Sequence, residues 1–321
     1  MRINDSKIAD GARIILFKCG NLKKGEKVCI VSEPGTKDVG RILHEVASAR
    51  NIRAEHAVID PLKTHGQEPP KELISRMIKS DIVIGITKLS MAHTEARYKI
   101  NRMGVRYLSL PDYSIGMLKN PALRIDFKKS ARRANHLAGL FTKARTVNVC
   151  TKNGTKITMD VTRRNGNFCP GYVDRLYKMG SPPDIESNIA PIEDQSCGII
   201  AVDASIAHPQ FGKLKSPVYL TIKKGKIIDI TGDAFYIKKL NRIFSDYGDK
   251  SRILAEFGVG FNEKAKVCGN MLLDEGAYGT AHVGFGSNST IGGMNKINFH
   301  LDFVFYVDQI ILDGRICRIR K

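Results

Sequence analysis

The chain has 321 residues, 42% of them hydrophobic, and a formal net charge of +19. That length suffices for two ordinary domains, each with its own core, and the composition excludes fibrous and disordered classes. The apolar run at residues 12–17, ARIILF, is too short and too interrupted by charge for a signal peptide or a membrane span. We therefore expect a cytoplasmic protein with no membrane partner.

Cysteine content and charge distribution narrow the choice further. The seven cysteines form no C-x-x-C pair and are odd in number, which predicts free thiols and argues against a thiolate zinc site. Lysine and arginine are spread along the whole chain, with small clusters but no recognised nucleic-acid module. Nucleic acid is therefore not the expected partner, although polyanion binding stays open as an alternative reading of the charge.

Residues 27–150 begin with an alternation of strands and helices. Apolar runs predict strands at 27–32, 53–59, 81–86 and 105–110. Helical spacing predicts helices at 38–51, 71–78 and 93–103. Strands separated by helices of this length predict a parallel, right-handed α/β sheet. The segment after the first strand, SEPGTKD, lacks both glycine-rich nucleotide fingerprints, so no nucleotide cofactor is expected.

Near residue 145 the pattern changes to short strands. A hairpin is predicted from residues 146–150 and 156–161 around the Asn153-Gly154 turn. Further strands are predicted at 198–202, 218–222, 226–231 and 303–311, with one helix at 234–246. The predicted fold class is α/β: an N-terminal parallel-sheet α/β domain, residues 1–144, followed by a mixed, mostly β metal-binding domain, residues 145–321.

The clearest chemical signal is His300-Leu301-Asp302, within the strand-like run INFHLDFVFYV. Residues two apart on a strand share one face, so this imidazole and this carboxylate can converge on one cation. Leu301 and Phe303 then point to the opposite face, into the core.

Other candidates for the same site lie upstream. His282 follows small residues in GTAHVGFG, which lets a ligand approach closely, although a histidine in an apolar run can also be an ordinary core residue. Glu256 interrupts an apolar run in ILAEFGVGFN, where a buried carboxylate needs a partner or a cation, unless it lies at an edge facing water. Asp274 and Glu275 are either a pair that orients an imidazole or a solvated turn.

Several motifs together resemble the aminopeptidase T group of metallo-aminopeptidases. In chain order they are Ser90-x-x-His93-Thr94-x-Ala96-Arg97, Gly154-Thr155, Pro183-x-x-Glu186 with Ala190-Pro191, Glu256-x-Gly258-x-Gly260-x-Asn262, Asp274-Glu275 leading to Gly279-Thr280-Ala281-His282, and His300-x-Asp302. They span nearly the whole chain, and they are specific in combination rather than singly.

The resemblance implies a homodimer that removes N-terminal residues from peptides with a metal-activated water. It implies two divalent ions, zinc, cobalt or manganese, on a set of five ligands: Glu186, Glu256, His282, His300 and Asp302. Glu186 and Glu275 are the candidate catalytic residues.

Two departures from that family open other interpretations. Ile185 stands where the peptidases have the first of two adjacent glutamates, and Gly286-Ser287-Asn288-Ser289 stands where they have a tyrosine. The superfamily to which these peptidases belong also resembles ring-cleaving dioxygenases of dihydroxypyridines. In that alternative His282, His300 and Asp302 hold one ferrous ion, and the two glutamates lie around them. A third possibility is an inactive relative that binds metal or a polyanion.

Overall fold

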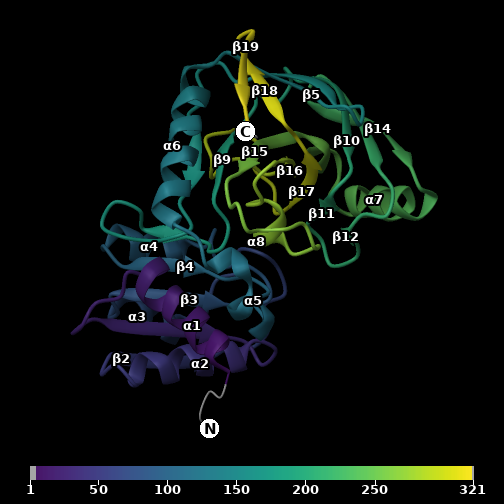
Figure 1. Cartoon of the computed structure of the whole chain (residues 1–321). Coiled ribbons are helices and arrows are strands. Elements are labelled where there is room, and N and C mark those ends of the chain that lie inside the picture. The colour runs from purple at the N-terminus through teal and green to yellow at the C-terminus, as the bar shows by residue number, and fades with distance from the viewer. Residues whose placement is uncertain (1–4, 320–321) are drawn as a thin grey trace. The chain divides into compact units, whose positions relative to one another are not determined.

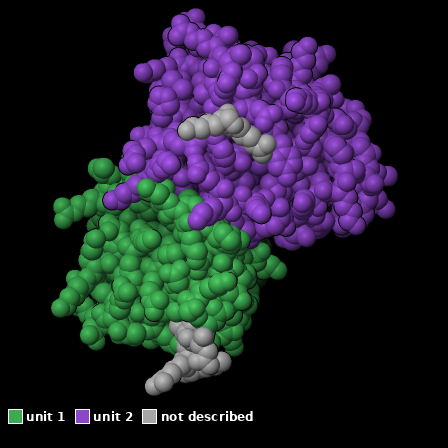
Figure 2. All heavy atoms as spheres, in the orientation of Figure 1, with its two compact units in different colours: residues 1–127, 169–183 green, residues 128–168, 184–321 purple. Residues whose placement is uncertain are grey.

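The computed structural model describes residues 5–319 of the chain. It divides into two compact units, residues 1–127 with 169–183 and residues 128–168 with 184–321, which Figure 2 shows in different colours. The predicted domain boundary between residues 144 and 145 stays a prediction. No helix in the described part of the chain is long and apolar enough to cross a membrane.

The first unit is a parallel sheet with helices, as the alternation of strands and helices predicts. Its five strands lie in the order β2-β1-β3-β4-β8, and every pairing within it is parallel. The strands are β1 (Lys27–Ser32), β2 (Arg53–Val58), β3 (Ile82–Ile86), β4 (Arg106–Ser109) and β8 (Met179–Gly180). The helices are α1 (Ser6–Arg13), π-helical η1 (Ile14–Cys19), α2 (Lys37–Ser48), α3 (Lys71–Ile78), α4 (Glu95–Arg102), α5 (Ile115–Lys119) and 3-10 helical η2 (Pro121–Leu123).

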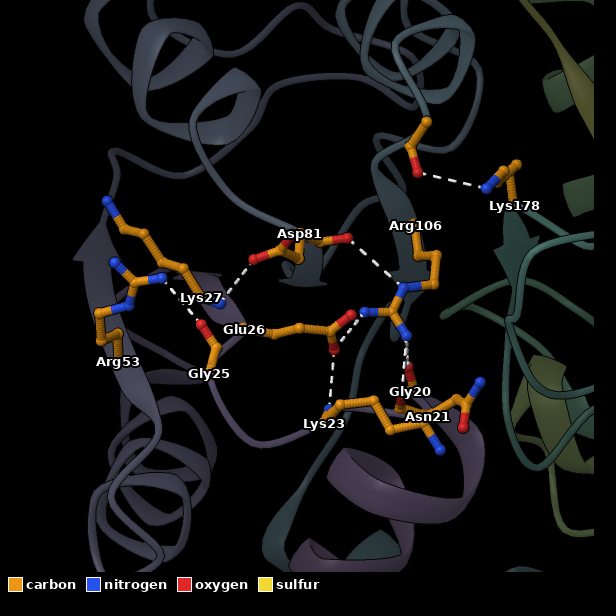
Figure 3. A network of polar contacts seen from close by, with 11 residues as sticks. Gly20, Asn21, Lys23, Gly25, Glu26, Lys27, Arg53, Asp81, Arg106 and Lys178 are labelled. Carbon is orange, nitrogen blue, oxygen red and sulfur yellow. Dashed lines mark hydrogen bonds and ion pairs between the residues drawn. The ribbon is translucent and has the colours of Figure 1, made fainter.

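A buried arginine ties the segments at one end of this sheet together (Figure 3). The Arg106 guanidinium donates to the carbonyls of Gly20 and Asn21 at 3.1 and 2.7 Å, and contacts Glu26 Oε2 at 2.6 Å. The Asp81 backbone carbonyl accepts from the same side chain. A fixed fork of donors suits this task, because it satisfies several carbonyls that burial would otherwise leave unpaired.

The second unit contains two antiparallel sheets of seven strands each. One sheet has the order β14-β13-β10-β6-β5-β18-β19, and β5 and β6 form the predicted hairpin. Its strands are β5 (Thr146–Cys150), β6 (Lys156–Asp160), β10 (Cys197–Val202), β13 (Val218–Lys223), β14 (Lys226–Gly232), β18 (Gln309–Leu312) and β19 (Arg315–Arg318). The prediction of a single strand at 303–311 is wrong. The strand is interrupted between β17 and β18, which belong to different sheets.

The other sheet has the order β12-β11-β17-β16-β15-β9-β7. Its strands are β7 (Asn167–Cys169), β9 (Glu186–Ile189), β11 (Ser205–Ile206), β12 (Gly212–Lys213), β15 (Leu254–Gly260), β16 (Thr280–Gly286) and β17 (His300–Tyr306). The helices of this unit are α6 (Phe127–Lys143), α7 (Ala234–Tyr247), 3-10 helical η3 (Asp249–Arg252) and α8 (Met271–Asp274). Figure 1 shows β15, β16 and β17 side by side, in agreement with their pairing.

One face of this second sheet is an aromatic core. Phe141 of α6 packs edge-on against Phe257 of β15, with ring centroids 6.0 Å apart. Phe244 of α7 contacts both Phe285 and Phe303. Glu256 directly precedes Phe257 and Asp302 directly precedes Phe303, and neighbours along a strand point to opposite faces. The packed face therefore holds the strands rigidly, and the polar residues between the aromatics are directed to the other face.

Candidate metal centre

Four neighbouring strands bring polar side chains to one face of the sheet. Residues directly opposite each other on antiparallel strands lie on the same face. Gly258 of β15 is opposite both Asn188 of β9 and His282 of β16. Gly284 of β16 is opposite both Glu256 of β15 and Asp302 of β17. The register therefore gathers side chains from four strands around two glycines.

The two glycines leave the space that the ligand side chains occupy. A Cβ at Gly258 would lie 2.1 Å from His282 Cε1. A Cβ at Gly284 would lie 2.4 Å from His300 Nε2 and 2.8 Å from Asp302 Oδ1. Glycine alternates with Phe and Val in EFGVG and HVGFG. The small residues around His282 were expected to let a ligand approach closely, but that Gly258 and Gly284 make room for the imidazoles of His282 and His300 was not predicted.

The candidate ligands form two overlapping groups. Glu186, Glu256 and His282 make one group, and Glu256, His300 and Asp302 make the other, with the ligand atoms of each group within 4.8 Å of one another. Glu256 faces both ways, because its Oε1 lies 3.7 Å from His282 Nε2 and its Oε2 lies 3.4 Å from His300 Nε2.

The remaining separations fit ligands on one cation. Glu186 Oε2 lies 3.4 Å from His282 Nε2, and Asp302 Oδ1 lies 3.0 Å from His300 Nε2. Metal–ligand bonds of ~2.1 Å place adjacent ligand atoms about 3 Å apart. A shared carboxylate between two such groups can serve one ion or bridge two.

Buried charge is the strongest physical sign that this cluster holds a cation. The carboxylates of Glu186, Glu256 and Asp302 belong to residues only 8% exposed, and His282 is 1% exposed. Within residues 5–319, the ion pairs of these carboxylates are with the two imidazoles. Burying this much like charge without a cation is costly, so protons or a metal must offset it.

The pKa shifts show how the cluster balances its buried negative charge when no metal is bound. Burial, reinforced by the Glu256 carboxylate and opposed by His282, raises the pKa of Glu186 to about 7. Burial alone would lower the pKa of His282, but Glu186 and Glu256 more than offset it and raise that pKa to about 9. The pKa of His300 is likewise raised well above its ordinary value, against burial and mainly by Asp302. Protonated imidazoles thus supply the positive charge that a divalent ion would otherwise supply.

Neighbouring groups orient these side chains. His300 Nδ1 lies 2.8 Å from the Ser287 carbonyl. Because a carbonyl can only accept, Nδ1 carries the hydrogen and Nε2 faces the carboxylates. Asn188 Nδ2 donates to Glu186 Oε1 at 2.8 Å, while Glu186 Oε2 is buried and has no hydrogen-bond partner in the described part of the chain. A histidine that donates its other N–H to a carbonyl is the usual arrangement of metal-binding imidazoles, and the residues present therefore fit a metal ion.

Glu275 lies outside both ligand groups. Its Oε1 is buried and finds no hydrogen-bond partner among the residues that the structure describes. Its pKa is raised well above the ordinary value by burial first and then by Asp302 and Glu186. This shift favours the protonated form of the carboxyl. The carboxylate of Asp274, by contrast, holds a neighbouring turn. It accepts hydrogen bonds from the backbone N–H groups of Cys268 and Gly269 at 2.7 and 2.8 Å.

The structure thus brings together the five side chains expected as ligands, while their action as ligands stays a prediction. The three ligands expected for the dioxygenase alternative do not fall in one ligand group. His282 belongs to the first group, and His300 and Asp302 belong to the second. Asn188 was missed although it stands two residues after Glu186, because no strand was predicted at 186–189. The orienting carbonyl of Ser287 was missed because a backbone group has no signal in the sequence.

Comparisons with known proteins place this centre in context. The sequence model of a family described as NicX, 2,5-dihydroxypyridine 5,6-dioxygenase, matches residues 13–317. The structure is similar to that of 2,5-dihydroxypyridine dioxygenase from Pseudomonas putida KT2440, with a TM-score of 0.81, 17% identity, and 99% and 98% of the two chains covered. It is also similar to wild-type AmpT from Thermus thermophilus, with a TM-score of 0.67, 13% identity and 97% of each chain covered. No curated protein sequence matches the chain.

These matches overturn the predicted aminopeptidase. The family model covers nearly the whole chain and describes a dioxygenase, so the expected hydrolase activity and peptide substrate are wrong. The motif resemblance reflected a real likeness of fold, which AmpT shares at low identity. It misled about the reaction because imidazoles and carboxylates on such a sheet suit metals of either chemistry. The homodimer stays a prediction.

Proposed function

Because the chain belongs to the NicX family of 2,5-dihydroxypyridine 5,6-dioxygenases, we propose that it opens a dihydroxylated pyridine ring with ferrous iron and dioxygen. The observation that supports this most directly is the buried cluster around Glu256, whose donors suit Fe(II). Bound there, Fe(II) would supply the redox-active centre that ring cleavage with dioxygen requires.

The group built on Glu256, His300 and Asp302 is the better candidate for the iron. Its His300 side chain keeps 31% of its surface exposed, whereas that of His282 keeps 2%. Reactants need a route to the metal, and the partly exposed imidazole provides it on this side of the cluster. Glu186 and His282 lie on the enclosed side, where they set the charge and shape around Glu256, or hold a second ion.

The carboxyl groups beside the candidate ligands are suited to accept and donate the protons of the reaction. A hydroxypyridine that binds as an anion must release a proton, and ring opening requires a proton to be returned. Glu275 is suited to returning the proton, because the raised pKa of its carboxyl favours the protonated form and its Oε1 has no hydrogen-bond partner among residues 5–319. Glu186 Oε2, in the same cluster, is the candidate to accept the proton that the substrate releases.

The direct test is oxygen uptake by anaerobically purified, iron-loaded protein. We expect uptake of one dioxygen per ring when 2,5-dihydroxypyridine is added, with loss of the aromatic ultraviolet absorption. Metal-free protein is the control, and 2-hydroxypyridine, which lacks the second hydroxyl, should support little turnover. An iron-loaded protein that consumes no oxygen with this substrate would remove the proposal.

The proposed role of Glu275 as an acid is tested by a separate substitution. Glu275→Gln keeps the size of the side chain but removes its exchangeable carboxyl proton, so kcat should fall about 100-fold, as for loss of a general acid. Iron content should stay at the wild-type level, because Glu275 lies outside both ligand groups. Stopped-flow kinetics and elemental analysis measure the two quantities. Wild-type kcat in this variant would exclude the role.

A further inference from the structure

The contact between His300 and Ser287 makes the following loop important. His300 Nδ1 lies 2.8 Å from the Ser287 carbonyl, and this contact leaves Nε2 directed at Glu256 and Asp302. If the carbonyl moved away, the ring would be free to rotate or to carry its hydrogen on Nε2, which blocks metal binding. The position of Ser287 therefore governs whether His300 is ready to bind a cation.

Two buried asparagines close the loop, residues 287–299, that follows β16. Asn288 and Asn295 are 0% and 6% exposed. The Asn288 N–H donates to the Asn295 carbonyl at 3.0 Å, and the Asn295 N–H returns a bond to Asn288 Oδ1 at 2.8 Å. Asn295 Nδ2 also donates to the Gly286 carbonyl at 2.7 Å, directly before Ser287.

A distant carboxylate, that of Glu193, anchors this loop. Its Oε1 accepts from Asn288 Nδ2 at 2.9 Å and from the Met294 N–H at 2.6 Å. Its Oε2 pairs with Arg164 Nη2 at 2.5 Å, and Arg164 Nη1 donates to the carbonyl of Gly292 in the same loop. The Glu193 and Arg164 side chains are only 19% and 12% exposed, so water competes little for these bonds.

The charge state of Glu193 agrees with this anchoring role. Burial by itself would raise its pKa, but the Met294 N–H, Asn288 and Arg164 together hold the pKa below its ordinary value. The side chain is therefore an ionised carboxylate, which forms stronger hydrogen bonds than a neutral acceptor. Neither Glu193 nor Arg164 belongs to a ligand group, so the pair has no direct part in metal binding.

We propose that Glu193 is a positioning residue: through Asn288 and the 287–299 loop it holds the Ser287 carbonyl against His300, so that Nε2 of His300 points at the cation. This inference rests on the proposed function insofar as it takes His300 as a metal ligand. It assigns a part in the metal site to a carboxylate that no metal-binding motif in the sequence includes.

The test uses Glu193→Ala, with Zn²⁺ as a diamagnetic probe in place of iron. Nuclear magnetic resonance of histidine-labelled, metal-free protein measures how fast the His300 Nδ1 proton exchanges with solvent, since this proton is present in both the neutral and the protonated ring. We expect at least ~10-fold faster exchange in the variant, and Zn²⁺ affinity reduced about 10–100-fold, as for other groups that orient metal ligands.

Two further variants make the result specific. Asp194→Ala is the matched control. Asp194 is the next residue, is exposed, and accepts a hydrogen bond from the side chain of its neighbour Gln195, so both quantities should stay at wild-type values. Glu193→Gln keeps an acceptor for the loop and loses the charge pair with Arg164. It should lie between wild type and Glu193→Ala, and it replaces that variant if the alanine protein does not fold.

The outcomes separate the two proposals. Wild-type exchange and wild-type Zn²⁺ affinity in both Glu193 variants would overturn the positioning role. Faster exchange in the variants of a protein whose wild type binds neither Zn²⁺ nor Fe²⁺ would reject the metal function and leave the role of Glu193 in placing His300 intact.

Discussion

His300→Ala is expected to lose its iron and, with it, ring cleavage. The imidazole Nε2 lies 3.0 Å from Asp302 Oδ1 and 3.4 Å from Glu256 Oε2, so it completes the second ligand group. Removing a ligand should weaken metal binding by more than the ~100-fold typical of groups that only orient ligands. Turnover should fall roughly 10⁴-fold or more, because most enzymatic acceleration, ~10⁶-fold at least, depends here on the metal.

His282→Ala is the informative comparison, measured by elemental analysis and oxygen uptake on the same preparations. If the iron is held by Glu256, His300 and Asp302, this variant keeps one iron per chain and loses only a second ion, should one be present. If the iron is held by His282, His300 and Asp302, both variants lose it equally. Near-normal iron in His300→Ala would exclude that residue from the centre altogether.

Gly284→Ala is expected to abolish metal binding without removing any ligand. The added Cβ would lie 2.4 Å from His300 Nε2 and 2.8 Å from Asp302 Oδ1, within the space where these atoms meet the cation. The backbone of β16 cannot yield easily, since it pairs on both sides and its other face packs on aromatic rings. Displacing ligands by ~1 Å costs about 100-fold or more in rate, and losing the ion costs more.

Gly139→Ala is the matched control for this substitution. Gly139 lies in α6, and a Cβ there would meet no atom of residues 5–319 within 4 Å, its own helix backbone aside. Alanine also favours a helix more than glycine does. This control should keep full iron and activity and unfold at the same or a slightly higher urea concentration. Iron content and oxygen uptake of Gly284→Ala at wild-type levels would show that the glycine is not needed to make room for the ligands.

The alternation of apolar segments predicted the first unit well. The strand at 27–32 and the helix at 71–78 appear with the expected bounds, and the parallel pairing follows from their spacing. These features are local, because a strand or a helix needs only its own periodicity to be recognised. The helix α6 was missed, and the strand expected at 303–311 proved to be two, because nothing in a local pattern marks a change of sheet.

The candidate site divides in the same way. Residue types and the spacing of His300 and Asp302 predicted that a cation binds near β17, since two residues on one strand face are adjacent whatever the rest of the fold. The sequence by itself therefore indicated a cluster of imidazoles and carboxylates that suits a metal ion, and an α/β architecture with a β-rich second part. It did not determine the reaction, because these donors serve hydrolysis and oxygenation equally.

Only the tertiary structure decided how the ligands are shared. The carboxylate of Glu256 contacts His282 on one side and His300 on the other. This follows from the register of three strands, in which Gly284 of β16 lies opposite Glu256 of β15 and opposite Asp302 of β17. That register depends on long-range pairing and on the aromatic layer beneath it, and a one-residue slip would turn every ligand to the other face. The carbonyl that orients His300, and the carboxylate of Glu193 behind it, likewise come together only when distant segments fold onto one another.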